Sequence, residues 1–162
     1  MTILQPAGEP RWMQEAIRLA SEGALTGSGG PFGAVVVREG QIVGRGCNHV
    51  TSANDPTAHA EVVAIRDACR RLGNFTLAGC ELYASCEPCP MCLAAIYWSR
   101  IQRVYYAATG VDAAAAGFDD EHIRRQLQLP LAAQSLPIEQ LSAPDALAPF
   151  AAWQQNESRN AY

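Results

Sequence analysis

The sequence predicts an α/β domain of three layers, α/β/α, with helices on both faces of a central sheet. Short β-rich runs at 32–38, 42–47, 81–85 and 103–107 alternate with segments of helical pattern. Strands that alternate with helices in this way indicate a sheet covered on two sides. The chain has 162 residues and is 49% hydrophobic, so a single domain can bury a core of its own.

The individual elements follow in chain order. An amphipathic helix is expected at 9–25 and is ended by the glycine-rich stretch 27–30. The runs 32–38 and 42–47 are expected to form a hairpin, because Glu39-Gly40 between them is typical of a turn. Further helices are predicted over 58–72, from about Pro90, and over 122–129. No internal repeat is found.

The composition of the sequence changes near its C-terminal end, where prolines become frequent. Prolines at 130, 137, 144 and 149 allow only short elements there. We therefore divide the chain into a core at 1–129 and a C-terminal segment at 130–162. The last residues, 154–162, are polar, and on local grounds they would form a frayed tail.

Charge and composition narrow the possible partners. The net charge is −4, and the twelve basic residues, all arginines, form only small clusters. A protein that binds along a nucleic-acid backbone usually has a continuous basic face instead. No stretch approaches the length of a membrane span, and the N-terminus has no signal-peptide layout. We expect a cytoplasmic protein that acts on small neutral molecules and binds neither nucleic acid nor membrane. In that reducing compartment the six cysteines need not form a disulfide framework. Cys47, Cys69 and Cys80 are expected to be small core residues and not metal ligands.

Two short motifs carry the chemistry. His59-Ala60-Glu61 is followed about thirty residues later by Pro88-Cys89-Pro90-Met91-Cys92. Together they supply three metal ligands, His59, Cys89 and Cys92, and one carboxylate that the metal does not need. A structural zinc site is normally closed by four protein ligands, whereas a catalytic site keeps three and leaves the fourth position to water. The motifs therefore predict a catalytic zinc centre.

The spacing of these residues supports that prediction. Cys89 and Cys92 lie three apart, so they share one face of a helix that begins near Pro90. The positive end of that helix favours thiolates over thiols. His59 and Glu61 are two apart and can approach one ion only in the first turn of their helix. Both helices must then point their N-termini at the metal, where Glu61 can act as general acid and base on a water whose pKa zinc lowers to roughly 7.

Two other interpretations of the motifs remain open. A structural zinc site would need a fourth ligand from Cys86, Cys80 or His49, and Cys86 is the strongest of these because it lies three residues before Cys89. The prolines at 88 and 90 oppose a common helical face for those two cysteines. A Cys-x-x-Cys redox pair is also possible, but in such a pair Glu61 would have no chemical role.

Beyond these motifs, the sequence resembles the small bacterial guanine deaminases of the cytidine-deaminase-like superfamily from about residue 10 to its end. The matching segments are Gly29-Gly30-Pro31-Phe32-Gly33, Asn48, Asn54-Asp55-Pro56-Thr57-Ala58-His59-Ala60-Glu61, Ser85-Cys86-Glu87-Pro88-Cys89-Pro90-Met91-Cys92, Ala95-Ile96-Tyr97-Trp98, Ala115-Ala116-Gly117-Phe118-Asp119-Asp120 and the closing Tyr162. The resemblance implies a mixed five-stranded sheet, one zinc ion per chain and hydrolysis of guanine to xanthine and ammonia. It also implies a homodimer in which the C-terminal segment packs on, or is exchanged with, the partner subunit.

The choice of guanine as substrate depends on residues outside the zinc motif. Asn48 is common to much of the superfamily and indicates only that a base or nucleoside is held. Phe32 could stack on a purine, or it could be a core residue at a strand start. Asp120 could accept hydrogen bonds from the ring N–H groups and the amine of guanine, or the acids at 119 and 120 could begin the next helix.

Two further positions bear on the pocket. In the resembling enzymes the final tyrosine closes the pocket of a partner subunit, which would give Tyr162 a function. At position 49 this chain has His where similar sequences often carry Asn, a difference expected to affect the rim of the pocket. Alternative functions are a tRNA adenosine deaminase, a cytosine or nucleoside deaminase, and a zinc-stabilised binding module without catalysis.

Overall fold

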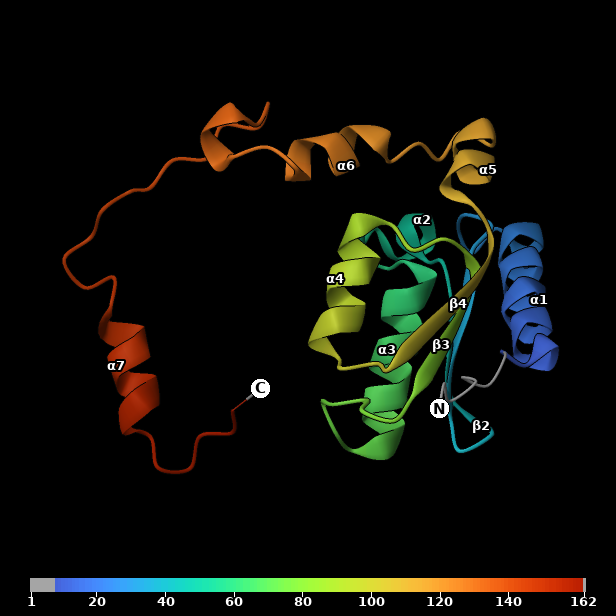
Figure 1. Ribbon diagram of the computed structural model, residues 1–162, viewed down its shortest axis with the longest axis horizontal. Helices are drawn as coiled ribbons and strands as arrows, with labels where there is room; N and C mark the ends of the chain where they lie inside the picture. Colours follow the sequence, from blue (N-terminus) through green and yellow to red (C-terminus); the bar gives the residue numbers. More distant parts are fainter. Residues whose placement is uncertain (1–7, 162) are drawn as a thin grey trace, which may run out of the picture. The chain divides into compact units, whose positions relative to one another are not determined.

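The computed structural model describes residues 8–161, and the chain forms two compact units. The first unit is Met1–Asp120 and the second is Glu121–Tyr162. Figure 1 traces the chain through both units in the colours of the sequence. All strands of the described residues belong to the first unit.

The first unit is built on a mixed sheet of four strands in the order β2-β1-β3-β4. The strands are β1 Gly33–Arg38, β2 Gln41–Cys47, β3 Glu81–Cys86 and β4 Arg103–Ala108. Strand β1 is antiparallel to β2 and β3, whereas β3 and β4 are parallel. The predicted hairpin is confirmed, since β1 and β2 are joined by Glu39 and Gly40, both at positive φ.

Helices cover both faces of this sheet, which confirms the predicted three layers for the first unit. Helix α1 Pro10–Thr26 packs on one face, and α3 Ala60–Leu72 and α4 Pro90–Trp98 lie on the other (Figure 1). Two short helices, α2 Val50–Ala53 and α5 Gly110–Ala115, follow β2 and β4. Among the described residues, no helix has both the length and the apolar character needed to cross a bilayer.

Alternate residues of the central strands supply two cores. Val35, Val37 and Tyr83 pack against apolar residues of α1. Their neighbours Val36 and Leu82 belong to the cluster that includes the inner side of α3. Successive side chains of a strand point to opposite faces, so apolar runs without alternation are expected where a sheet is buried on both sides.

Two glycines of β2 bring α3 close to the sheet. A Cβ at Gly44 would collide with the backbone oxygen of Ala64, and one at Gly46 would collide with that of Ala60. Any side chain at these positions would therefore push the helix away from the strand. The close approach fixes the N-terminal turn of α3, which carries His59 and Glu61.

The expected fifth strand is absent from the described residues, so the five-stranded sheet is a wrong prediction for this part of the chain. After β4 the chain forms α5, and beyond Asp120 it forms only α6 Glu121–Leu127, the 3₁₀ helix η1 Leu131–Ala133 and α7 Ala148–Gln155. Proline has no N–H to donate to a strand ladder. Prolines at 130, 137 and 144 interrupt the stretch that follows α6.

The described residues of the second unit form no core of their own. None of its described residues is buried. Large apolar side chains remain exposed along it, among them Leu127, Leu131, Leu147 and Phe150. An apolar surface of this kind is typical of a segment that buries its side chains against another surface.

A buried carboxylate ties α3 to β2 in the first unit. Asp67 on α3 accepts a hydrogen bond from the Arg45 N–H of β2 at 3.0 Å and another from Arg71 Nε at 2.9 Å. Burial alone would raise the pKa of Asp67, but these bonds and the nearby arginines outweigh it and hold the pKa below its usual value. The charged form is therefore the one that the folded state stabilises.

Replacing Asp67 by Asn is expected to lower the free energy of unfolding by about 1 to 2 kcal/mol at pH 7, because charge-assisted hydrogen bonds are lost. The folded pKa of Asp67 lies below its unfolded value, so the stabilisation is complete above the unfolded pKa and disappears as the pH falls through the folded one. Urea unfolding at pH 7 and near pH 3 measures the difference. Asp145→Asn, at an exposed position, serves as the control and should change stability by less than about 0.5 kcal/mol. An equal loss at both pH values for Asp67→Asn would contradict this role of the charge.

Candidate metal centre and active site

The N-termini of α3 and α4 bring three potential metal ligands together. His59 is the N-cap of α3 and Cys89 is the N-cap of α4, with Pro90 as the first helical residue as the sequence predicts. Cys92 follows within the first turn of α4. The ligand atoms of these three residues all lie within 4.8 Å of one another.

The distances within this group suit a tetrahedral zinc ion. The Sγ atoms of Cys89 and Cys92 each lie 3.5 Å from His59 Nδ1. Tetrahedral bonds of ordinary length from zinc to sulfur and to imidazole nitrogen require a separation of about 3.6 Å. One imidazole and two thiolates can therefore hold zinc here with little movement of the side chains.

The candidates for a fourth ligand lie elsewhere. Cys86 is not a member of the ligand group, and its thiol contacts the backbone oxygen of Thr109 at 3.5 Å. His49 is also outside the group, and its ring contacts Cys47 and Ser52. Cys80 is buried in the core of the first unit. The described residues thus offer three ligands and no fourth, which disfavours a closed structural site.

Electrostatics within the protein favour thiolate at this centre. A hydrogen bond from Cys92 lowers the pKa of Cys89 to about 4 against the opposing effect of burial, and His59 adds to the lowering. The adjacent Cys89 in turn raises the pKa of Cys92 and of His59. Because thiolate is the form that binds metal, the protein groups alone already prepare one ligand for zinc.

Glu61 lies beside the ligands without joining them. It occupies the first turn of α3, is only 7% exposed, and is close enough to Cys92 for a side-chain hydrogen bond. Burial raises the pKa of its carboxyl group. A buried carboxylate next to a metal group, with no structural ion pair of its own, is suited to proton transfer.

Asn48 and Phe32 lie in the segments that precede α3. Asn48 is buried, and its side-chain oxygen accepts hydrogen bonds from the N–H groups of Gly30 and Val50, both at 3.1 Å. Phe32 packs against the core on the α3 side, and its ring meets that of Phe118 edge-on at 4.9 Å between centroids. Phe32 therefore makes a structural contact whether or not it also stacks on a substrate.

A groove of about 370 Å³ lies next to Phe32. It is lined by α1, by the ends of β3 and β4, and by α5, with Phe118 and Cys86 beside Phe32. None of the three metal ligands, Glu61 or Asn48 contributes to its lining. The groove is therefore not the metal centre itself.

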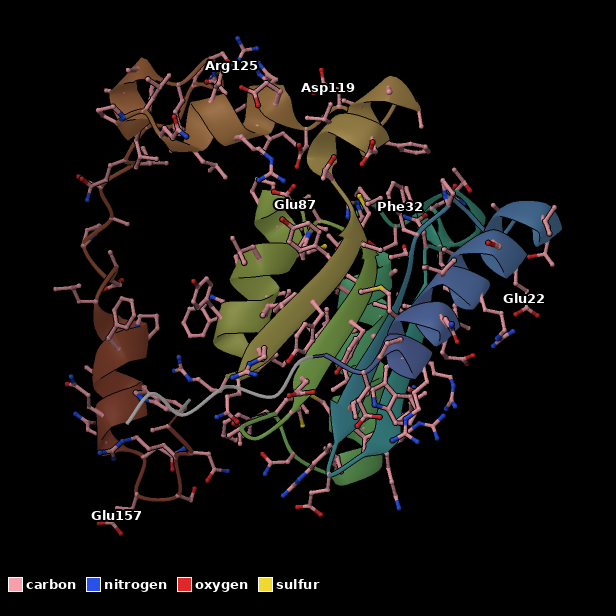
Figure 2. The ribbon with its side chains drawn as sticks, turned by 45° about the vertical axis from the view of Figure 1, so that its right-hand side comes forward. Glu22, Phe32, Glu87, Asp119, Arg125 and Glu157 are labelled. Atoms are coloured by element: carbon pink, nitrogen blue, oxygen red, sulfur yellow. The ribbon has the colours of Figure 1, made fainter. Side chains whose placement is uncertain are left out.

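The other two predicted substrate-binding residues are Asp120 and Tyr162. Asp120 ends the first unit, two residues after Phe118, and is half-buried. Figure 2 shows Asp119, Phe32 and Glu87 at the same end of that unit. Tyr162 lies outside the described residues. Phe118 is not among the site residues predicted from the sequence, although it stands in the segment Gly117-Phe118-Asp119-Asp120 that carries part of the resemblance.

The fold and the centre together define a class of protein. Two helix N-termini on one face of a mixed sheet carry His59, Cys89 and Cys92, and a glutamate that is not a ligand follows the histidine by two residues. This combination, H-x-E followed by P-C-x-x-C, defines the zinc-dependent deaminases of nucleobases and nucleosides.

Comparisons with known proteins agree with this class. Residues 8–108 match the family model of the cytidine and deoxycytidylate deaminase zinc-binding region, and the chain belongs to that family. It is 50% identical to guanine deaminase of Bacillus subtilis (strain 168) over 151 residues, which are 93% of this chain and 97% of the relative. The X-ray structure of guanine deaminase from Bacillus subtilis superposes with a TM-score of 0.92 at 49% identity, covering 96% of this chain and 99% of that one. A tRNA-specific adenosine deaminase of Aquifex aeolicus (strain VF5) is 46% identical, but over 96 residues, or 59% of this chain and 60% of the relative.

Proposed function

We propose that this protein is a zinc-dependent aminohydrolase that converts guanine and water to xanthine and ammonia. The observation that carries the proposal is the near full-length likeness to a guanine deaminase, which includes the C-terminal segment. The adenosine-specific relative matches over little more than half of this chain. The zinc motif by itself is common to both activities.

His59, Cys89 and Cys92 hold one zinc ion per chain in this proposal. When bound, zinc supplies a water molecule of lowered pKa as the nucleophile for carbon 2 of the purine. Glu61 accepts the proton of that water and delivers it to the ring nitrogen next to carbon 2. Glu61 then takes the second proton from the hydroxyl group now attached to carbon 2 and transfers it to the amine, so that the carbon–nitrogen bond breaks and ammonia leaves as a neutral molecule.

Three residues orient the base. Asp120 accepts hydrogen bonds from the ring N–H and the amine of guanine, because an ionised carboxylate is only an acceptor. Asn48 binds the opposite, acceptor-bearing edge, and Phe32 stacks on the purine plane. Such positioning makes the attack on carbon 2 effectively intramolecular.

The C-terminal segment 130–162 completes the site of a partner subunit. The second unit buries none of its described residues, although it carries many large apolar side chains. A homodimer with exchanged C-terminal segments would cover those side chains and bring Tyr162 to the pocket of the partner.

In this arrangement the core 1–129 carries the zinc deaminase chemistry. The location of the protein in the cytoplasm stays a prediction.

A comparison of substrates tests this function. Zinc-loaded protein is incubated with guanine, guanosine, adenine, cytosine, cytidine or an RNA stem-loop that contains adenosine, and ammonia release is measured. We expect kcat/KM for guanine to exceed that for each other substrate by at least about 100-fold, because a site that pairs with polar groups strongly rejects compounds that lack them. Efficient deamination of the RNA would instead favour the adenosine-specific relatives. Release from none of them, together with unfolding on chelation of zinc, would indicate a binding module.

A further inference from the structure

A chain of polar contacts links the end of β2 to the glycine-rich loop 27–30. Cys47 Sγ lies 3.4 Å from His49 Nε2, and His49 Nδ1 lies 3.5 Å from Ser52 Oγ. The Ser52 hydroxyl donates to the backbone oxygen of Ser28 at 2.5 Å. The neutral imidazole with its proton on Nδ1 satisfies both of its contacts, accepting from the Cys47 thiol and donating to Ser52. Cys47 is thus partly exposed and joined to His49, and the expectation that it is a simple core residue is wrong.

The glycine-rich loop in turn holds the side chain of Asn48. The oxygen of that amide accepts from Gly30 N–H in the loop and from Val50 N–H at the start of α2, each at 3.1 Å. A Cβ on Gly29 would collide with the backbone and side-chain oxygens of Asn48, so the loop can press against Asn48 only because this residue is glycine. Both lone pairs of the amide oxygen are then occupied.

The consequence concerns the other end of the same amide. Asn48 Nδ2 has no hydrogen-bond partner among the described residues. With its oxygen held by two backbone donors, Asn48 cannot rotate to offer that oxygen to a ligand. It can present only N–H groups, and these match an acceptor such as the carbonyl oxygen or the imidazole-ring nitrogen of a 6-oxopurine.

We propose that Ser52, supported by His49, is a positioning residue for Asn48. Its bond to Ser28 holds the loop 27–30 against α2, so that Gly30 and Val50 keep the Asn48 oxygen occupied and the amide faces substrate only as a donor. The inference deepens the proposed function, because it assigns the part of the fold that orients one of its substrate residues.

A double-mutant cycle tests the proposal. Ser52→Ala is expected to raise the KM for guanine by about threefold to tenfold, the range for loss of one hydrogen bond, while kcat changes by less than about twofold. In an Asn48→Ala background the same change should have no further effect on KM. Ser52→Thr keeps the hydroxyl and should restore the wild-type KM. Ser21→Ala, at another exposed serine whose hydroxyl donates to a backbone oxygen, is the control and should leave KM unchanged. An equal factor in both backgrounds, or no effect of Ser52→Ala, would overturn the proposal.

Two readouts do not depend on turnover. Calorimetric binding of hypoxanthine, a 6-oxopurine without the amine that is removed, should weaken by the same factor in Ser52→Ala. The double variant should bind it no more weakly than Asn48→Ala alone. Amide hydrogen exchange at Gly30 and Val50 should be faster in Ser52→Ala. It should also be faster in Gly29→Ala, because the added Cβ pushes the loop 27–30 away from Asn48. If wild-type protein neither deaminates guanine nor binds hypoxanthine, the proposed function fails while the exchange rates still decide the positioning role. Unchanged exchange at both amides in Ser52→Ala would overturn that role.

Discussion

Replacing Glu61 by Gln is expected to lower kcat for guanine by about 100-fold to 10,000-fold, the usual contribution of a positioned general acid and base. Gln has nearly the shape of Glu but cannot accept and return a proton. Because Glu61 does not belong to the ligand group, the variant should keep its zinc and its fold. Steady-state kinetics, elemental analysis and thermal unfolding of the same preparation measure the three properties.

The control for this variant is Glu39→Gln, which makes the same chemical change at an exposed carboxylate in the β1–β2 turn. Its kinetics should equal those of wild type. Near-normal turnover of Glu61→Gln would show that the proton follows another route. A variant that has lost zinc would instead give Glu61 a structural part in the metal centre.

Replacing Cys89 by Ala is expected to remove both zinc and activity. Only three protein ligands are present in the described residues, so the loss of one thiolate leaves an imidazole and a single sulfur, too few to retain the ion in a catalytic site. Elemental analysis after dialysis should find about one zinc per chain in wild type and almost none in the variant. Turnover of guanine should fall to background.

Cys86→Ser is the matched comparison, because Cys86 lies three residues before Cys89 but outside the ligand group. Serine can still donate to Thr109 O, the present contact of the Cys86 thiol. This variant should keep its zinc and most of its activity. Full zinc in Cys89→Ala, or loss of zinc in Cys86→Ser, would contradict the ligand assignment.

The parts of the fold and site that sequence predicts well depend on local spacing. Cys89 and Cys92 are three apart with Pro90 between them, and this pattern specifies a helix start with both sulfurs on one face. His59 and Glu61 are confined to a first turn by the same geometry. The hairpin follows from Glu39-Gly40, and the α/β/α layers follow from the alternation of strands and helices.

Other features depend on which segments meet in space. The hydroxyl of Ser52 reaches Ser28, twenty-four residues away, and no periodicity of the sequence indicates that contact. The sequence predicts Cys47 to be a small core residue, yet its thiol contacts the ring of His49. The resemblance implies five strands, whereas the prolines after residue 129 favour short elements, in agreement with the absence of a strand after β4 in the described residues. The second unit exposes large apolar side chains and buries none of its described residues, so its own sequence does not indicate how it packs.

The most direct test of the central claim is the product balance of zinc-loaded wild-type protein with guanine. The proposed reaction predicts that each guanine consumed yields one xanthine and one ammonia, with turnover abolished by a zinc chelator and restored by added zinc. Xanthine is followed by its absorbance and ammonia by a coupled assay in the same sample. Protein that carries zinc and is folded, yet leaves guanine unchanged while releasing ammonia from adenosine or cytidine, would contradict the account.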